Sequence, residues 1–211
     1  MNISDEVLFL EEAFDLLNER YFESALQKIA ITIQSAPRAH GHFTPWDSWD
    51  DNGTRIKEIN IGAESLRRPV PNIIATLMHE MVHYYCHVNG IKDTSRGNSY
   101  HNKRFKEECE KRGLVISYEN GIGYSRTQPD QALIDLVDHM NWNTRVKLYR
   151  TRSDTRTEGN DPGDEGASEN EKKKSSTRKY VCPKCGLSIR ATKVVRIACM
   201  ECNNTQMQEA G

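Results

Sequence analysis

Residues 76–90 read TLMHEMVHYYCHVNG and place two histidines, His79 and His83, four positions apart, with Glu80 directly after the first. Side chains at positions i and i+4 of a helix lie about one turn apart on the same face. Two imidazoles arranged in this way can bind one Zn²⁺ at about 2.0–2.1 Å. A carboxylate beside them can take a proton from a water that the ion has made more acidic. The segment therefore predicts two metal ligands and a general base on one helix.

The same pattern also fits an ordinary amphipathic helix, because a motif with only three fixed positions occurs by chance. The neighbouring residues favour the metal. They predict a buried helix that begins near Pro71 and ends at Gly90. The largely apolar residues of this helix are Ile73, Ile74, Leu77, Met78, Met81, Val82 and Tyr85. Buried imidazoles beside a buried carboxylate are costly unless another group satisfies them, and a metal ion does so.

A catalytic zinc normally has three protein ligands and one open position. His87 lies eight residues after His79, which is about 12 Å along a helix axis and too far for one ion. His101 follows His83 after 17 residues, which is enough chain for a loop to return to the metal. We therefore predict His101, at the start of a second helix that ends at Gly113, as the third ligand. The remaining histidines are interpreted as structural or surface residues: His40, His42 and His139.

A second metal site is predicted near the C-terminus, where residues 181–204 read VCPKCGLSIRATKVVRIACMECNN. Two C-x2-C pairs separated by 13 residues fit two tight turns that together form a closed tetrahedral site. A redox pair is disfavoured because the two pairs match and no βαβ pattern accompanies them. A module this small needs such a metal to fold. The predicted ligands of this structural zinc are Cys182, Cys185, Cys199 and Cys202.

Composition divides the 211 residues into three parts. Residues 151–179 contain no Val, Leu, Ile, Phe, Tyr or Trp, so they have almost nothing to bury. The sequence therefore predicts a folded domain over residues 1–150, a disordered linker over 151–178, acidic and then basic, and a zinc ribbon over 179–208.

The first domain mixes helical and strand-like patterns. Its remaining two cysteines, Cys86 and Cys109, fall on helix faces and are interpreted as core residues. The other predicted elements are a helix that Ser4 caps, strands over residues 28–33 and 55–61, a turn-rich connection between them in which Trp46 and Trp49 pack, a turn over 121–127, and a helix over about 130–140.

The net charge of −1 hides an uneven distribution. Residues 1–150 carry −3, residues 151–171 carry −5 and residues 172–211 carry +7. A cationic end predicts an anionic partner such as nucleic acid, and a solubilising tail or a protein-binding ribbon is the alternative. Tyr180 is the only aromatic residue of the ribbon that qualifies for stacking on bases. The candidate phosphate contacts are Lys172, Lys173, Lys174, Arg178, Lys179, Arg190, Lys193 and Arg196.

The sequence favours an intracellular location. No apolar run approaches the roughly 20 residues that span a bilayer, and the N-terminus lacks the pattern of a signal peptide. Six cysteines without a secretory signal favour thiols or metal ligands over disulfides. We expect a cytoplasmic protein, nuclear in a eukaryote, without a membrane partner.

Two stretches, TLMHEMVHYY (76–85) and YHNKRFKEECEKRGL (100–114), resemble the SprT-like metallopeptidases, which include the Spartan proteases of DNA–protein crosslink repair. Further segments follow in family-like order: AFDLLNERYF (13–22), EINIGAESL (58–66), GYSRT (123–127) and the terminal cysteine module. The family commonly flanks the third histidine with glycines, whereas Tyr100 and Asn102 flank it here.

The resemblance implies that His79, His83 and His101 bind a catalytic zinc and that Glu80 is the catalytic acid and base. It also implies an α+β, minigluzincin-like core, in which a short sheet supports the active-site helix, with a small zinc ribbon at the C-terminus. The implied activity is that of an endopeptidase with one catalytic and one structural zinc. Its substrates would be proteins bound or crosslinked to DNA, single-stranded or damaged, which is a role in DNA repair.

The alternative is a non-catalytic, zinc-containing adaptor that binds nucleic acid and uses the histidine site only for structure. Glu80 argues against this alternative, because a structural site has no need of a free carboxylate beside the metal.

Overall fold

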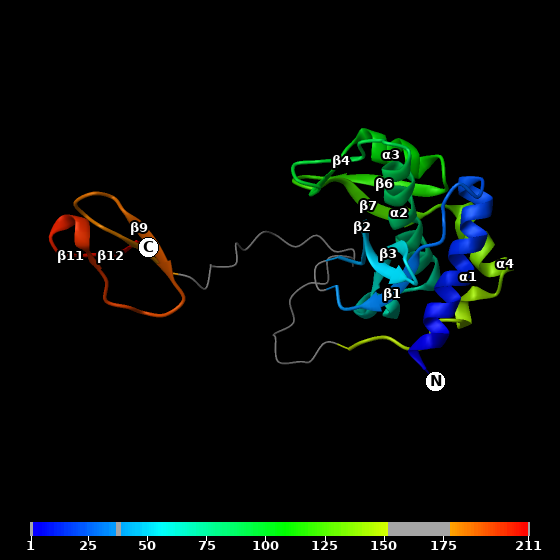
Figure 1. Cartoon of the computed structure of the whole chain (residues 1–211), viewed down its shortest axis with the longest axis horizontal. Coiled ribbons are helices and arrows are strands. Elements are labelled where there is room, and N and C mark those ends of the chain that lie inside the picture. Colours follow the sequence, from blue (N-terminus) through cyan, green and yellow to red (C-terminus); the bar gives the residue numbers. More distant parts are fainter. Residues whose placement is uncertain (1, 37–38, 152–177, 211) are drawn as a thin grey trace. The chain divides into compact units, whose positions relative to one another are not determined.

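The computed structural model describes residues 2–36, 39–151 and 178–210. The chain forms two compact units, Met1–Pro162 and Gly163–Gly211, which are described separately (Figure 1). The linker predicted over residues 151–178 lies outside the described residues except at its two ends.

The first unit is a mixed α+β fold with two sheets. A three-stranded sheet has the order β1-β3-β2, and a four-stranded sheet has the order β4-β5-β7-β6. The elements of this unit are α1 (Ile3–Phe22), β1 (Ala30–Gln34), β2 (Gly41–Asp51), β3 (Thr54–Gly62), the 3-10 helix η1 (Ala63–Arg67), α2 (Val70–Val88), β4 (Thr94–Ser95), β5 (Tyr100–His101), α3 (Lys103–Glu110), β6 (Leu114–Glu119), β7 (Gly123–Pro129), α4 (Gln131–His139) and the 3-10 helix η2 (Trp142–Thr144).

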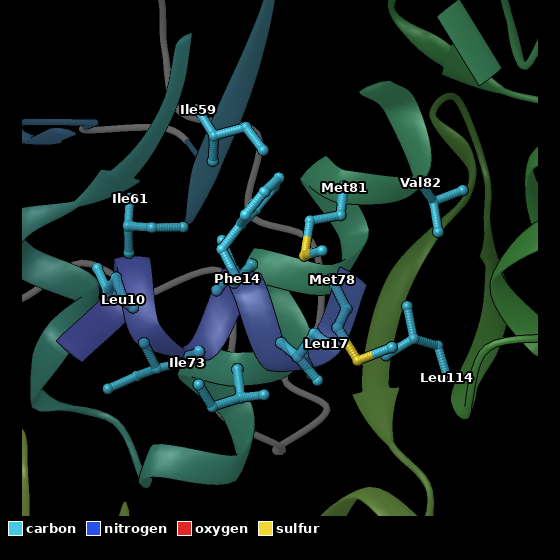
Figure 2. Close-up of a cluster of buried hydrophobic side chains, with 14 of the residues drawn as sticks. Leu10, Phe14, Leu17, Ile59, Ile61, Ile73, Met78, Met81, Val82 and Leu114 are labelled. Atoms are coloured by element: carbon cyan, nitrogen blue, oxygen red, sulfur yellow. The ribbon is translucent and has the colours of Figure 1, made fainter. Parts of the chain in front are cut away.

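Helix α2 is the central element of this unit and confirms the helix predicted from residues 71–90. It contacts strands of both sheets and the helices α1, α3 and α4, and it runs between the two sheets in Figure 1. Pro71 occupies its first turn, where a missing N–H costs nothing. Its apolar side chains meet those of α1 and β3, and Figure 2 shows Ile73, Met78 and Met81 beside Phe14 and Ile59.

Helix α1 confirms the predicted N-terminal helix, but its cap is Asn2 rather than Ser4, which lies inside the first turn. Glu6 on this helix is buried, and its Oε1 accepts hydrogen bonds from the backbone N–H groups of Lys147 and Leu148 at 3.1 and 2.9 Å. These bonds hold the segment after η2 against α1.

The prediction of a turn-rich connection over residues 45–53 is correct only at Asn52 and Gly53, because residues 45–51 belong to strand β2, which forms a hairpin with β3. The pairing shifts between Thr44 and Trp49, so the intervening residues bulge from the ladder. Trp46 and Trp49 are 67% and 47% exposed and do not pack as predicted. The turn predicted over residues 121–127 is likewise mostly strand β7, which pairs with β6.

The second unit has two small sheets, ordered β12-β8-β9 and β10-β11. In the described part of this unit, the buried hydrophobic cluster consists of Tyr180, Cys182, Cys199 and Met207. Among the described residues, no helix has the length and hydropathy needed to cross a membrane. The elements of this unit are β8 (Arg178–Val181), β9 (Ser188–Ala191), β10 (Ala198–Cys199), the 3-10 helix η3 (Met200–Cys202), β11 (Thr205–Gln206) and β12 (Gln208–Ala210).

Candidate metal centre

The three predicted histidines meet at one point of the first unit. His79 and His83 lie one turn apart on α2, and His101 lies on β5. The Nε2 atom of His83 is 3.2 Å from Nε2 of His79 and 3.1 Å from Nε2 of His101. One ligand atom from each residue lies within 4.8 Å of the others, as a shared metal ion requires.

The third histidine comes from a strand, which corrects the prediction that it begins a helix. His101 pairs with Gly123 of β7, and its backbone N–H donates to the carbonyl oxygen of Ile122 at 3.0 Å. Gly123 has a φ of +77°, and a Cβ atom there would collide with the carbonyl oxygen of His101. A glycine is therefore required opposite the ligand, where the two backbones approach closely.

The outer nitrogen of each ring has its own oxygen partner. Nδ1 of His83 lies 2.6 Å from Oδ2 of Asp93, and Nδ1 of His101 lies 3.4 Å from the carbonyl oxygen of Ile122. Carboxylates and carbonyls can only accept, so these Nδ1 atoms carry the proton. Nδ1 of His79 lies 2.7 Å from the hydroxyl of Thr127. This arrangement leaves the Nε2 lone pairs free for a metal.

The histidine cluster fits zinc on two grounds. Two nitrogens bound tetrahedrally at 2.0–2.1 Å are about 3.3 Å apart, close to the observed 3.1 and 3.2 Å. Three facing lone pairs also repel one another unless a cation lies between them. Burial and the neighbouring imidazoles lower the pKa of His79 well below its usual value, and burial with His83 lowers the pKa of His101 to about 4. The rings of these two ligands are thus neutral at pH 7.

Phe105 of α3 forms an apolar contact shared by all three imidazoles. Its ring centroid lies 4.6, 4.4 and 4.7 Å from those of His79, His83 and His101. Phe105 is fully buried, so it limits the rotation of the rings and the access of water from that side.

Glu80 lies next to the first ligand and is only 5% exposed. Burial raises its pKa to about 7, while the backbone N–H of Phe43 donates a hydrogen bond that favours the charged form. A Cβ atom on Gly41 would lie 3.3 Å from Cγ of Glu80, so β2 packs closely against this side chain. The carboxylate is therefore held in place by a neighbouring strand and has a pKa suited to proton transfer near neutral pH.

Asn102, directly after the third ligand, ties together the loop that carries the site. Its side-chain oxygen caps α3 by accepting from the N–H groups of Arg104 and Phe105 at 2.8 and 3.2 Å. Its side-chain amide donates to the carbonyl oxygen of Lys92 at 2.7 Å, and its backbone N–H donates to that of Asp93 at 2.9 Å. Asn102 thus links the loop that carries Asp93 to the start of α3.

The four predicted cysteines also converge, with one Sγ atom from each within 4.8 Å of the others. The Sγ atoms of Cys185 and Cys199 are 3.7 Å apart, and tetrahedral Zn–S bonds of 2.3 Å predict about 3.8 Å. Backbone N–H groups of Cys185 and Lys184 lower the pKa of Cys182 to about 7, whereas hydrogen bonding with Cys185 raises the pKa of Cys202 to about 12, so the fit to a metal rests on the spacing of the sulfur atoms. This site therefore also fits zinc.

The predicted basic contacts are only partly described. Lys172, Lys173 and Lys174 lie outside the described residues. The other five are exposed on the second unit: Arg178, Lys179, Arg190, Lys193 and Arg196. Lys179 and Arg190 face each other across β8 and β9. Tyr180, the proposed stacking residue, is only 4% exposed, and its hydroxyl accepts from the N–H of Val195 at 3.2 Å; its ring is therefore not free to stack on a base.

The remaining histidines are not part of the three-histidine cluster, although His40 is close enough to help lower the pKa of His79. Nδ1 of His40 lies 2.7 Å from the hydroxyl of Ser65, which agrees with a structural role. The others are exposed: His42, His87 and His139. Sequence reasoning missed Asp93 and Thr127, which lie 10 and 48 residues from the histidines they contact. No local pattern marks a partner so distant in the chain.

A comparison with family models identifies the relatives of this chain. The SprT-like family matches residues 10–121, just over half of the chain and including Glu80 and all three clustered histidines. The chain belongs to the SprT-like family. No curated protein and no solved structure gives a significant match. The SprT-like match ends before Thr127 and before the four cysteines.

Proposed function

We propose that this SprT-like protein is a zinc-dependent endopeptidase. The proposal depends on one observation above all: the imidazoles of His79 and His83 on α2 converge with that of His101 on β5, beside the buried carboxylate of Glu80 on α2. His79, His83 and His101 would hold the catalytic zinc, and the four cysteines of the second unit would hold a structural one. We also propose that the core has the minigluzincin arrangement that the family implies.

When bound, zinc supplies Lewis acidity that polarises a peptide carbonyl and makes a water molecule more acidic. Glu80 accepts the proton of the attacking water at its carboxylate and then donates it to the nitrogen of the leaving amine. The N–H of Phe43 orients the carboxylate. The Nδ1 partners Thr127 and Asp93 hold their imidazoles in the orientation that points Nε2 at the metal.

The substrate class is proposed from the second unit and from the family resemblance. Exposed Lys179 and Arg190 lie directly opposite each other in a strand pair. Like charges at such positions destabilise a sheet, so this placement favours an anionic partner such as DNA. A DNA-binding ribbon joined to the protease would raise the concentration of protease near proteins bound or crosslinked to DNA. Such a protein acts in the cytoplasm, or in the nucleus of a eukaryote.

The test is proteolysis by the zinc-loaded full chain and by Glu80→Gln, with a protein crosslinked to single-stranded DNA as substrate. We expect Glu80→Gln to retain both zincs and to lose cleavage by at least about a hundredfold, because proton transfer contributes about 10²–10⁴ to rate. Glu11→Gln, at an exposed site of α1, is the matched control and should cleave normally. Equal cleavage by Glu80→Gln would exclude the mechanism, and no cleavage by the unmodified chain would favour the adaptor.

A further inference from the structure

A cluster of aromatic and cationic side chains lies on the four-stranded sheet beside the metal centre. It contains Tyr100 of β5, Tyr124 of β7 and Tyr118 of β6, which are three neighbouring strands. Arg96 from the β4–β5 turn and Lys106 from α3 complete it. We call these five residues the tyrosine–cation surface. None of them contributes to either metal site.

The members of this surface contact one another. The rings of Tyr118 and Tyr124 meet edge to face with centroids 5.3 Å apart, and a hydrogen bond joins the side chains of Tyr118 and Tyr100. The guanidinium carbon of Arg96 lies 4.6 Å from the centroid of Tyr100, and Nζ of Lys106 lies 5.4 Å from that of Tyr124. Tyr118 is 55% exposed, so a large part of a positioned aromatic ring faces solvent.

The charge of this region differs from that of the rest of the first unit. Residues 92–106 carry five Lys or Arg and one Asp, a net charge of +4, whereas residues 1–150 together carry −3. The one acid, Asp93, points its carboxylate at His83. The positive charge is concentrated in the loop and the first turn of α3, because Glu107, Glu108 and Glu110 follow on the same helix. Glu110 also pairs with Lys106, with Oε1 and Nζ 3.5 Å apart.

Two cations of residues 92–106 occupy positions at which a positive charge does not stabilise the fold. Lys103 and Arg104 are exposed in the first turn of α3, which contains no acidic residue. The N-terminal end of a helix is the positive end of its dipole, so a cation there is unfavourable. A helix optimised for stability alone would have Asp or Glu at these positions. Their charge is better explained by an anionic ligand.

We propose that the tyrosine–cation surface binds single-stranded nucleic acid, with an unpaired base stacked on Tyr118 and phosphates contacted by Arg96, Lys106 and the first turn of α3. Exposed aromatic rings with nearby cations are the combination that recognises single strands. A duplex offers no unstacked base to such a ring. Tyr180 of the ribbon, being buried, cannot take this role.

This inference deepens the proposed function, because Tyr100 and Tyr124 directly adjoin His101 and its partner Gly123 in the sheet. Successive side chains of a strand point to opposite faces of a sheet, so a nucleic acid bound there would lie on the strands that carry His101 and Gly123 without contacting the metal centre itself. The inference concerns binding alone, however. It can be tested in the zinc-loaded full-length Glu80→Gln chain, so that absence of proteolysis and absence of binding are separate results.

The experiment measures fluorescence anisotropy of a labelled oligothymidylate of about 15 nucleotides with variants in that background. Tyr118→Ala removes the stacking ring. Arg96→Asn removes a charge, and asparagine tolerates the positive φ of 53° at this position. The matched controls are Tyr149→Ala, 49% exposed, and Lys28→Asn, also exposed and distant in sequence. The ribbon is the same in all variants, so its contribution to binding cancels when the Kd of a variant is divided by the Kd of the parent Glu80→Gln chain.

We expect Tyr118→Ala to raise the Kd for the oligothymidylate about tenfold, within the range for one stacked base. Arg96→Asn should weaken binding and reduce the dependence of log K on log salt by about 0.7. Both controls should bind like the parent. Thermal unfolding and zinc content, measured on every variant, verify that Tyr118→Ala and Arg96→Asn remain folded.

Three outcomes would overturn the proposal. The first is that Tyr118→Ala and Arg96→Asn bind the oligothymidylate with the same Kd as the two control variants. The second is an equal loss of affinity for a duplex of the same length, which has no free base to stack. The third is a loss of affinity for oligoglutamate that matches or exceeds the loss for the oligothymidylate, which would assign the surface to acidic peptides. Oligouridylate run in parallel distinguishes RNA from DNA, and a Tyr118-dependent affinity for either supports the proposal.

Discussion

The Oδ2 atom of Asp93 lies 2.6 Å from Nδ1 of His83, on the side of the ring away from the other two histidines. Both side chains are largely buried, each with about 15% of its side chain exposed. The carboxylate fixes the orientation of the imidazole and the nitrogen that carries its proton. A loop residue outside the His-Glu-x-x-His motif therefore prepares the second histidine of that motif to bind a metal.

Replacement of Asp93 tests this role. We expect Asp93→Ala to lower the zinc affinity of the histidine site about 10–100-fold, the usual effect of losing a partner of a metal-bound histidine. Competition with a chromophoric chelator measures this affinity. Asp135→Ala, at an exposed site of α4, serves as the control. Unchanged affinity in Asp93→Ala would show that His83 does not depend on the carboxylate.

Gly123 is expected to be essential for the position of the third ligand. Gly123→Ala places a methyl group against the carbonyl oxygen of His101 at a φ of +77°. It should lower both the zinc affinity of the histidine site and the free energy of unfolding, the latter by more than about 1 kcal/mol. Gly121→Ala is a close control, since its φ is +93° but its Cβ would meet nothing within 4 Å. If both variants lose zinc equally, the collision with His101 is not the cause.

Asn102 is expected to stabilise α3 through its cap. Asn102→Ala should reduce the free energy of unfolding by about 1 kcal/mol, measured by urea denaturation of the zinc-loaded chain. Asn102→Asp retains an acceptor for the N–H groups of Arg104 and Phe105 and should recover most of the loss. Failure of Asn102→Asp to recover stability would indicate that the bond from the side-chain amide to Lys92 matters more.

The sequence predicted the three clustered histidines and the helix α2 correctly, but it did not predict the neighbouring strands β5 and β2. Apolar spacing around His79 and His83 was sufficient to predict α2, because a central helix buries residues on most of its circumference. The β5 strand was missed because two residues show no periodicity. Strand β2 was missed because Pro45 and its acidic neighbours resemble a turn, and a bulge permits them in a strand at the edge of the sheet.

The partners of the site residues could not be predicted for a different reason. Thr127 and Phe43 come close to the site only after the sheets pack on α2, and no local spacing relates either residue to the histidine motif. The cysteine module is the opposite case, since all four ligands lie in two short repeats whose spacing alone specifies their geometry. Long-range partners follow from the fold, whereas short metal-binding repeats follow from the sequence.

Removal of metal should affect the two units differently. Two of the four residues in the buried cluster of the ribbon are the cysteines themselves, so little remains to hold this unit without zinc. We expect a strong chelator to make the amides of residues 178–210 exchange rapidly, while α1 and α2 stay protected by their large core. Hydrogen exchange with mass spectrometry measures both. Protection that persists in the ribbon after complete removal of zinc would contradict a structural role for the metal.

The central claim is that imidazoles from α2 and β5 share one ion. Metal content after equilibration with a weak chelator tests it most directly, in the unmodified chain, in His101→Ala and in the control His87→Ala, which changes an exposed histidine of α2. We predict about two zincs per chain in the unmodified protein and in His87→Ala, which corresponds to one catalytic and one structural site. We predict about one zinc per chain in His101→Ala, because the catalytic site would lose a ligand. Two zincs retained by His101→Ala would contradict the shared site.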